Sequence, residues 1–125
     1  MLIIEKETID MLEAFHMREK TILTSFNFES IRNAKAYNPE YRVGYLYQCS
    51  HEEALERIQS IHGDELCLKA HTMTPEQTAL YQSMGYSVRA WGVYNVELMQ
   101  HVCNCGANGM TVNFPDKLTA YLAEK

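Results

Sequence analysis

The sequence lacks any long hydrophobic run, and this absence bears on where the protein works. No apolar stretch approaches the roughly 20 residues that a helix needs to cross a bilayer. The segment Met1–Glu7 has no positively charged region followed by an apolar core, so it does not resemble a secretory signal peptide. We therefore expect a soluble, cytoplasmic chain with no membrane span.

Clusters of basic residues are also missing. Lys and Arg total 11 against 16 Asp and Glu, which gives a formal net charge of −5. Because binding to a phosphate backbone needs clustered cations, this balance argues against a nucleic-acid partner.

The four cysteines lack the spacing of a zinc site. Cys49, Cys67, Cys103 and Cys105 do not form a pair of CxxC motifs. Cys103 and Cys105 fall on a predicted helix, where positions i and i+2 point in different directions. We expect reduced thiols, most of them in the core.

What the sequence does contain is a regular alternation of predicted strands and helices. Strand-like segments start near residues 21, 42, 65, 87 and 108, a spacing of about 22 residues. Each is followed by a helix-start signal, at Asn27, Ser50–Glu53, Thr74–Gln77, Asn95 and Phe114–Asp116. A leading helix is predicted over residues 3–17, with Ile9, Leu12 and Phe15 in its apolar stripe.

This alternation predicts an α/β fold with a parallel sheet. The expected architecture is a partial TIM (β/α)8 barrel of about five parallel βα units, forming one domain over residues 1–125, since a whole barrel takes about 250 residues. An open doubly wound sheet is the alternative, although neither GxGxxG nor GxxxxGK occurs.

The segment Gly85–Asn95 shows the repeating unit most clearly. Gly85 is suited to closing a helix in the left-handed conformation. One repeat earlier in the chain, Gly63 is expected to end the helix that precedes the third strand. Ser87–Val93 is predicted to be a strand covered on both faces. Trp91, the only tryptophan, lies near the carboxyl end of this strand, the end that faces the active site in α/β barrels.

A series of short motifs then occurs in a fixed order. They are Ile22–Phe26, Pro39, Val43–Leu46, Gly85, Ala90–Asn95, Gly106–Met110 and Asn113–Asp116. In this order and spacing they resemble the C-terminal half of the glycerophosphodiester phosphodiesterase family, over nearly the whole chain.

The resemblance implies a (β/α)8 barrel that cleaves glycerophosphodiesters to glycerol 3-phosphate and an alcohol. In that family a divalent cation, Ca or Mg, works with a pair of histidines. These groups lie in His-Arg-Gly, Glu-x-Asp, His-Asp and Glu-x-Lys motifs, none of which stands at a strand end here. The resemblance therefore implies a chain that has no catalytic residue, binds no metal by itself, is inactive alone and supplies pocket wall.

Two segments depart from the family pattern. Trp91–Asn95 is one residue longer than the family's Trp-Thr-Val-Asn, and Val112-Asn113 stands where the family has Thr-Asp. Both changes fall where the resemblance places the mouth of the barrel.

The candidate substrate-binding residues are Trp91, Phe26, Lys69 and Tyr45. Trp91 is read as pocket wall, with a core tryptophan as the alternative. Phe26 follows the first predicted strand. Lys69 ends the third, as a cation for phosphate or as a solvated lysine. Tyr45 and Tyr47 share one face of their strand. That face either lines the pocket or packs beneath a helix.

The histidines on or beside predicted helices carry no expected chemistry. Because helices form the outer ring of a barrel, we expect surface positions for His16, His51, His62 and His101.

A part-barrel has two open sheet edges and an apolar inner face, which costs burial energy of about 25 cal/mol per Å2. We therefore expect pairing with a second copy, as a homo-oligomer, or with a missing N-terminal half.

The resemblance leaves two functions open. One is the C-terminal half of a hydrolase of lipid metabolism, with a glycerophosphodiester as the small-molecule partner of the complete enzyme. The alternative is a free-standing, non-catalytic domain for phosphate binding or dimerisation.

Overall fold

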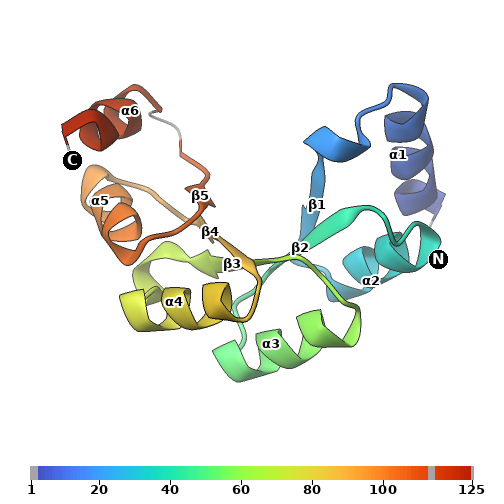
Figure 1. Ribbon diagram of the computed structural model, residues 1–125, viewed down its shortest axis with the longest axis horizontal. Coiled ribbons are helices and arrows are strands. Elements are labelled where there is room, and N and C mark those ends of the chain that lie inside the picture. The colour runs from blue at the N-terminus through green and yellow to red at the C-terminus, as the bar shows by residue number, and fades with distance from the viewer. Residues whose placement is uncertain (1–2, 113–114, 125) are drawn as a thin grey trace. The chain divides into compact units, whose positions relative to one another are not determined.

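The computed structural model describes residues 3–112 and 115–124, along which strands and helices alternate (Figure 1). The strands are β1 (Ile22–Ser25), β2 (Arg42–Leu46), β3 (Glu65–Lys69), β4 (Ser87–Trp91) and β5 (Gly109–Met110). The α-helices are α1 (Ile3–Ala14), α2 (Phe28–Tyr37), α3 (His51–Ser60), α4 (Pro75–Ser83), α5 (Val96–Cys105) and α6 (Pro115–Glu124). Two short 3-10 helices are η1 (Arg18–Lys20) and η2 (Ala70–Thr72).

The strands form one parallel sheet in the order β1-β2-β3-β4-β5. Leu23 of β1 lies beside Val43 of β2, and Arg89 of β4 lies beside Gly109 of β5, both in parallel pairs. This arrangement confirms the predicted α/β class with parallel βα units. By its contacts, the chain divides into two compact units, Met1–Glu65 and Leu66–Lys125.

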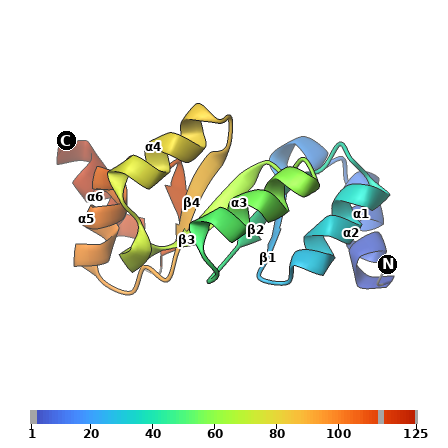
Figure 2. The same cartoon turned by 90° about the horizontal axis from the view of Figure 1, so that it is seen from below.

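In the first unit, helices cover one face of the strands. The helix α2 packs on β1 and β2, α1 packs on α2, and α3 packs on β2. Figure 2 shows α1 and α2 side by side. The buried core of this unit is mostly apolar and comprises Ile9, Ile31, Ala34, Tyr41, Val43, Tyr45, Tyr47, Ala54 and Ile58.

In the second unit, β4 is covered on one side only. The helix α4 packs on β4 and on α5, and α5 also contacts α6 and η2. Val88 and Ala90 are buried, whereas Ser87, Arg89 and Trp91 are partly exposed. The prediction of a strand covered on both faces is therefore wrong for β4. The second face of a barrel strand is covered by side chains from the other strands of a closed ring.

Four of the five predicted helix starts are confirmed by cap hydrogen bonds, while Phe114, in the fifth, lies outside the described residues. At each of the four a side-chain oxygen accepts from the backbone N–H three residues on, satisfying a donor that the helix leaves unpaired. The pairs are Asn27 with Ser30 (3.4 Å), Ser50 with Glu53 (3.1 Å), Thr74 with Gln77 (3.1 Å) and Asn95 with Leu98 (2.8 Å).

The predicted helix end at Gly85 is confirmed, α5 ends at Gly106 in the same way, and α3 ends before Gly63. Gly85 and Gly106 adopt left-handed backbone conformations, with φ of 97° and 85°. After α3, however, the left-handed residue is His62, with φ of 54°. Gly63 is needed for space instead, because a Cβ there would lie 2.3 Å from Cδ1 of Ile58.

The remaining differences concern apolar residues and element lengths near the chain ends. The helix α1 ends at Ala14, and Phe15 is 72% exposed, so it does not belong to the apolar stripe that buries Ile9. Leu122, an apolar residue of α6, is 53% exposed. The fifth strand, predicted to start near residue 108, is the two-residue β5, and Asn113 of the second departure from the family pattern lies outside the described residues.

The cysteines are free thiols, as predicted. Cys67 and Cys105 are buried, but Cys49 and Cys103 are partly exposed, so half of the thiols rather than most lie in the core. Among the described residues, no helix has the length and apolarity required to traverse a bilayer.

Candidate functional site

The second unit brings two of the predicted site residues together at the carboxyl ends of adjacent strands. Lys69 is the last residue of β3 and Trp91 is the last residue of β4. The Nζ atom of Lys69 lies over the Trp91 ring, 5.6 Å from its centroid. This distance is within the range of a cation–π interaction.

The orientation of Trp91 is set by the strand that carries Lys69. The indole Nε1–H donates a hydrogen bond to the backbone carbonyl of Cys67, 3.1 Å away. Because Cys67 and Lys69 are two residues apart on β3, their side chains point to the same face of the sheet. The indole ring and the ammonium group are therefore both positioned by β3.

Tyr94, which the sequence did not single out, is the third residue of this site, and Gly92 brings it there. Gly92 has φ of 71°, which ends β4 at Trp91 rather than at the predicted Val93. A Cβ on Gly92 would lie 3.4 Å from the Tyr94 hydroxyl and 3.6 Å from Cγ of Lys69. The Tyr94 ring thus lies beside Gly92, on the side where the Lys69 stem also lies, and Tyr94 is 73% exposed. The extra residue in Trp91–Asn95 was the available sequence signal.

We refer to Lys69, Trp91 and Tyr94 as the cation–aromatic cluster. Among the described residues, no carboxylate pairs with the Lys69 ammonium. The cluster therefore offers a positive charge, a phenol hydroxyl and an aromatic surface. These groups suit a ligand that combines an anionic group with an apolar or polyol part.

In the first unit, Phe26 follows the carboxyl end of β1 and is 51% exposed. Its position is defined by its neighbours on both sides. The Asn27 N–H donates to Oγ of Ser25 at 3.0 Å, and the Asn27 side chain caps α2. Phe26 thus stands at a strand end with its ring largely in solvent, while Asn27 serves as a cap.

Tyr45, also in the first unit, packs beneath helices. Its hydroxyl accepts a hydrogen bond from Nη1 of Arg57 in α3 at 2.5 Å, and its ring meets Phe28 of α2 edge-on, with centroids 5.5 Å apart. Burial raises the pKa of Tyr45, while the hydrogen bond from Arg57 opposes that rise. Of the two orientations considered, the structure has the one that faces the helices.

Two histidines differ from their expected surface positions. His51 and His101 are partly buried, whereas His16 and His62 are exposed. Nδ1 of His51 lies 2.8 Å from the hydroxyl of Tyr47, and burial lowers the pKa of His51. Nε2 of His101 lies 2.8 Å from the carbonyl of Met73. Each ring therefore joins a helix to a strand or loop beside it.

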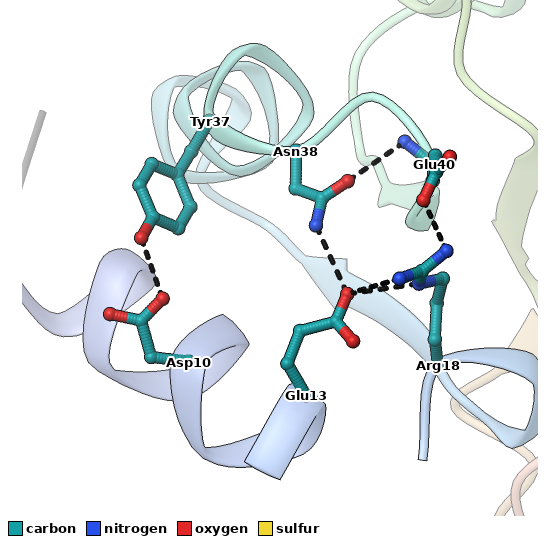
Figure 3. A network of polar contacts seen from close by, with 6 residues as sticks. All are labelled: Asp10, Glu13, Arg18, Tyr37, Asn38 and Glu40. Atoms are coloured by element: carbon teal, nitrogen blue, oxygen red, sulfur yellow. Dashed lines mark hydrogen bonds and ion pairs between the residues drawn. The ribbon is translucent and has the colours of Figure 1, made fainter. Parts of the chain in front are cut away.

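The first unit has a polar cluster of its own at the amino ends of β1 and β2, where Arg18 precedes β1 and Glu40 precedes β2 (Figure 3). Arg18 donates to Glu13 at 2.9 Å and pairs with Glu40, and Asn38 donates to the same Glu13 oxygen at 3.2 Å. We call Glu13, Arg18, Asn38 and Glu40 the Arg18 clasp. In α/β barrels the amino end of the strands contributes stability, and catalysis takes place at the other end.

A cavity of about 400 Å3 adjoins the clasp and is lined by Glu13, His16, Arg18 and Glu19. The buried Tyr41 hydroxyl has no hydrogen-bond partner among the described residues, and burial raises its pKa. A larger groove, of about 710 Å3, runs between α2 and α3 and includes Arg32, Pro39 and His62. Neither cavity includes a predicted site residue.

The described residues do not fit the divalent metal that the resemblance implies. They contain no group of three or more His, Cys, Asp or Glu side chains close enough together to hold a metal ion. A hard divalent cation needs several oxygen ligands around one point. The cation–aromatic cluster offers an ammonium and a phenol there instead, so it is not a metal site.

Five parallel strands alternating with helices, with candidate binding side chains at the carboxyl ends of β3 and β4, define an α/β protein built as part of a TIM-type barrel. The chain belongs to the glycerophosphoryl diester phosphodiesterase family, which matches residues 3–117.

Individual relatives agree with this assignment. A glycerophosphodiester phosphodiesterase of Caldanaerobacter subterraneus subsp. tengcongensis is 26% identical over 115 residues, covering 92% of this chain and 47% of the relative. The chain therefore spans about half the length of the curated relative it matches.

Solved structures show the same fold over a similar share. A candidate glycerophosphodiester phosphodiesterase from Galdieria sulphuraria superimposes with a TM-score of 0.86 and 21% identity, covering 95% of this chain and 50% of the other. A phosphodiesterase from Oleispira antarctica, in complex with the product sn-glycerol-3-phosphate, matches with a TM-score of 0.73 and 22% identity, covering 82% and 41%.

Proposed function

We propose that this chain is the C-terminal half of a glycerophosphodiester phosphodiesterase-like hydrolase and that it supplies wall to the substrate pocket. The observation that carries this proposal is that the family matches nearly all of this chain, whereas this chain matches only about half of a relative. The family match spans residues 3–117, yet the chain corresponds to only 47% of its curated relative. The metal ligands and the catalytic histidines then belong to the other half of the barrel.

The substrate of the complete enzyme is a glycerophosphodiester, hydrolysed to glycerol 3-phosphate and an alcohol. The Oleispira antarctica neighbour, crystallised with sn-glycerol-3-phosphate, supports this class of ligand. In this chain Lys69 brings a positive charge toward the phosphate, and Trp91 brings an apolar surface toward the carbon skeleton. Phe26 is a separate candidate wall residue in the first unit.

Tyr45 takes a supporting role in this proposal. Its hydroxyl is bonded to Arg57 and its ring lies against Phe28, so it holds α2 and α3 on β2. Trp91, Lys69 and Phe26 remain as the proposed substrate contacts.

The first test is an assay of the purified chain with glycerophosphocholine, with Ca2+, with Mg2+ and with neither. We expect no hydrolysis above the protein-free blank under any of these conditions, because the described residues hold no metal-binding group. Metal-dependent turnover by the chain alone would refute the assignment of the reactive groups to another half.

The second test supplies the other half. A coding sequence that lies directly upstream and contains His-Arg-Gly and Glu-x-Asp motifs would be co-expressed with this chain. We expect the co-purified complex to hydrolyse glycerophosphodiesters in a metal-dependent way, while neither half does so alone. A complex that forms and stays inactive would favour a non-catalytic binding domain.

A further inference from the structure

The cation–aromatic cluster holds its own positive charge on its aromatic surface. The Lys69 ammonium lies over the Trp91 ring at 5.6 Å, and among the described residues no carboxylate neutralises it. An indole face is the surface on which proteins bind quaternary ammonium groups. Here the ammonium group of Lys69 already lies over the Trp91 ring.

The arrangement is held by the backbone as well as by the charge. The hydrogen bond from the Trp91 indole to the Cys67 carbonyl (3.1 Å) fixes the ring beside β3, from which Lys69 extends. The Tyr94 hydroxyl and Cγ of Lys69 lie on the same side of Gly92, 3.4 Å and 3.6 Å from the point where a Cβ on Gly92 would stand. A ligand that meets this cluster therefore finds two hydrogen-bond donors and a positive charge.

We infer that the cation–aromatic cluster selects the alcohol part of the substrate by charge. It accepts glycerophosphodiesters whose alcohol is an uncharged polyol or carries a negative charge, and it disfavours those with a trimethylammonium or ammonium head group. Lys69 is the residue that sets this preference, since it contributes the charge and also occupies the face of Trp91. The inference rests on the proposed function, because it concerns the same pocket wall.

The chain has a single tryptophan, which makes the test direct. The indole Nε1–H resonance of Trp91 is followed by 15N-edited NMR during titration with sn-glycerol 3-phosphate, glycerophosphoglycerol or glycerophosphocholine. We expect the first two ligands to shift this resonance with a dissociation constant at least about tenfold lower than that of glycerophosphocholine.

Two variants assign the preference to Lys69. Lys69→Met removes the charge and keeps a stem of similar size, so the order of affinities is expected to reverse in favour of glycerophosphocholine. Lys69→Arg keeps a cation that stacks on indole and is expected to retain the original order.

A third variant tests the phenol of the cluster. Tyr94→Phe removes only the hydroxyl and is expected to weaken the binding of sn-glycerol 3-phosphate without reversing the preference.

Three results would overturn the inference. They are the absence of a ligand-dependent shift of the Trp91 resonance, an equal affinity of the wild-type chain for all three ligands, and an unchanged order of affinities in Lys69→Met. Hydrolysis by the co-purified complex is measured separately. A failure of the charge preference is therefore distinguishable from a failure of the proposed activity.

Discussion

Gly92, which follows Trp91, shapes the candidate site through its backbone conformation, and Gly106 after α5 provides a comparison. Gly92 and Gly106 both have left-handed backbones, with φ of 71° and 85°, yet their surroundings differ. A Cβ on Gly92 would meet Tyr94 and Lys69, whereas a Cβ on Gly106 would have no atom within 4 Å. This contrast separates the cost of the backbone conformation from the geometry of the cluster.

We expect Gly92→Ala and Gly106→Ala each to lower the free energy of unfolding by about 1–2 kcal/mol, the cost of a left-handed alanine. Only Gly92→Ala is expected to shift the fluorescence maximum of Trp91, because its added methyl group comes into van der Waals contact with Tyr94 and the Lys69 stem, whereas that of Gly106→Ala contacts nothing. Urea denaturation and emission spectra of the folded proteins check both statements. An equal spectral change in Gly106→Ala would contradict the assignment of Tyr94 to the cluster.

Asn95 joins the cluster to the helix behind it. Its side-chain oxygen accepts from the Leu98 N–H at 2.8 Å, at the start of α5. We expect Asn95→Ala to lower the free energy of unfolding by about 1 kcal/mol, because one backbone donor of α5 loses its partner. Asn95→Ser, which keeps a capping oxygen, serves as the control in the same urea titration. A loss in Asn95→Ser as large as that in Asn95→Ala would show that the cap is not the cause.

We expect His51 to make the stability of the first unit depend on pH. Burial lowers its pKa below the ordinary value of 6.5, so below that pH the unfolded chain binds a proton that the folded chain resists. Stability is therefore complete above about pH 6.5 and falls as the pH drops toward the depressed folded value.

The measurement is urea unfolding at pH 7.5 and pH 5.5. We expect His51→Gln to lose less stability than the wild-type chain between the two pH values. His71→Gln, at an exposed position, is the matched control and is expected to follow the wild-type chain. A wild-type slope in His51→Gln would rule out His51 as the source.

At the scale of elements, the Arg18 clasp ties α1 to the segment between α2 and β2. Arg18 reaches Glu13 and Glu40, and Asn38 shares an oxygen of Glu13 (Figure 3). Beside the clasp, the Tyr37 hydroxyl of α2 donates to Asp10 of α1 at 2.6 Å. This hydrogen bond is the largest cause that lowers the pKa of Asp10.

A double-mutant cycle measures how much the clasp contributes. We expect the coupling energy between Arg18 and Glu13 to exceed that between Arg32 and Glu29, an exposed pair within one turn of α2. The reason is that Arg18 contacts two carboxylates from different segments, whereas exposed pairs within one helix contribute little. The cycles use alanine variants and urea unfolding. Equal coupling in the two pairs would mean that the clasp does not hold α1.

At the scale of the whole molecule, the strands at the ends of the sheet order matter most. In the described part of the chain, β1 and β5 each pair on one side only, with β2 and β4. Ser87, Arg89 and Trp91 of β4 are partly exposed, while the residues between them are buried against helices. Strand edges of this kind invite pairing with another chain.

We therefore predict that the purified chain associates at micromolar concentration. Size-exclusion chromatography with light scattering is expected to report a mass above the 14.4 kDa of one chain, decreasing toward it on dilution. A compact monomer at micromolar concentration would contradict this prediction. Co-purification with an N-terminal half is expected to replace self-association, because both partners would use the same edges.

Local signals in the sequence predicted the elements well because each depends on a few neighbouring residues. The Asn27 and Thr74 caps involve a partner three residues away, and the Gly85 helix end needs only a left-handed backbone. Such features need no knowledge of packing. The order of motifs also led to the family that matches residues 3–117.

The sequence by itself thus determined the alternation of strands and helices, the caps, the fold class and the family. Only the tertiary structure decided which face each side chain takes. Tyr45 packs against Arg57, His51 meets Tyr47, and Lys69 lies over Trp91, although none of these contacts follows from spacing alone. The physical reason is that a strand has two faces, and the packing of helices and neighbouring strands determines which face is buried.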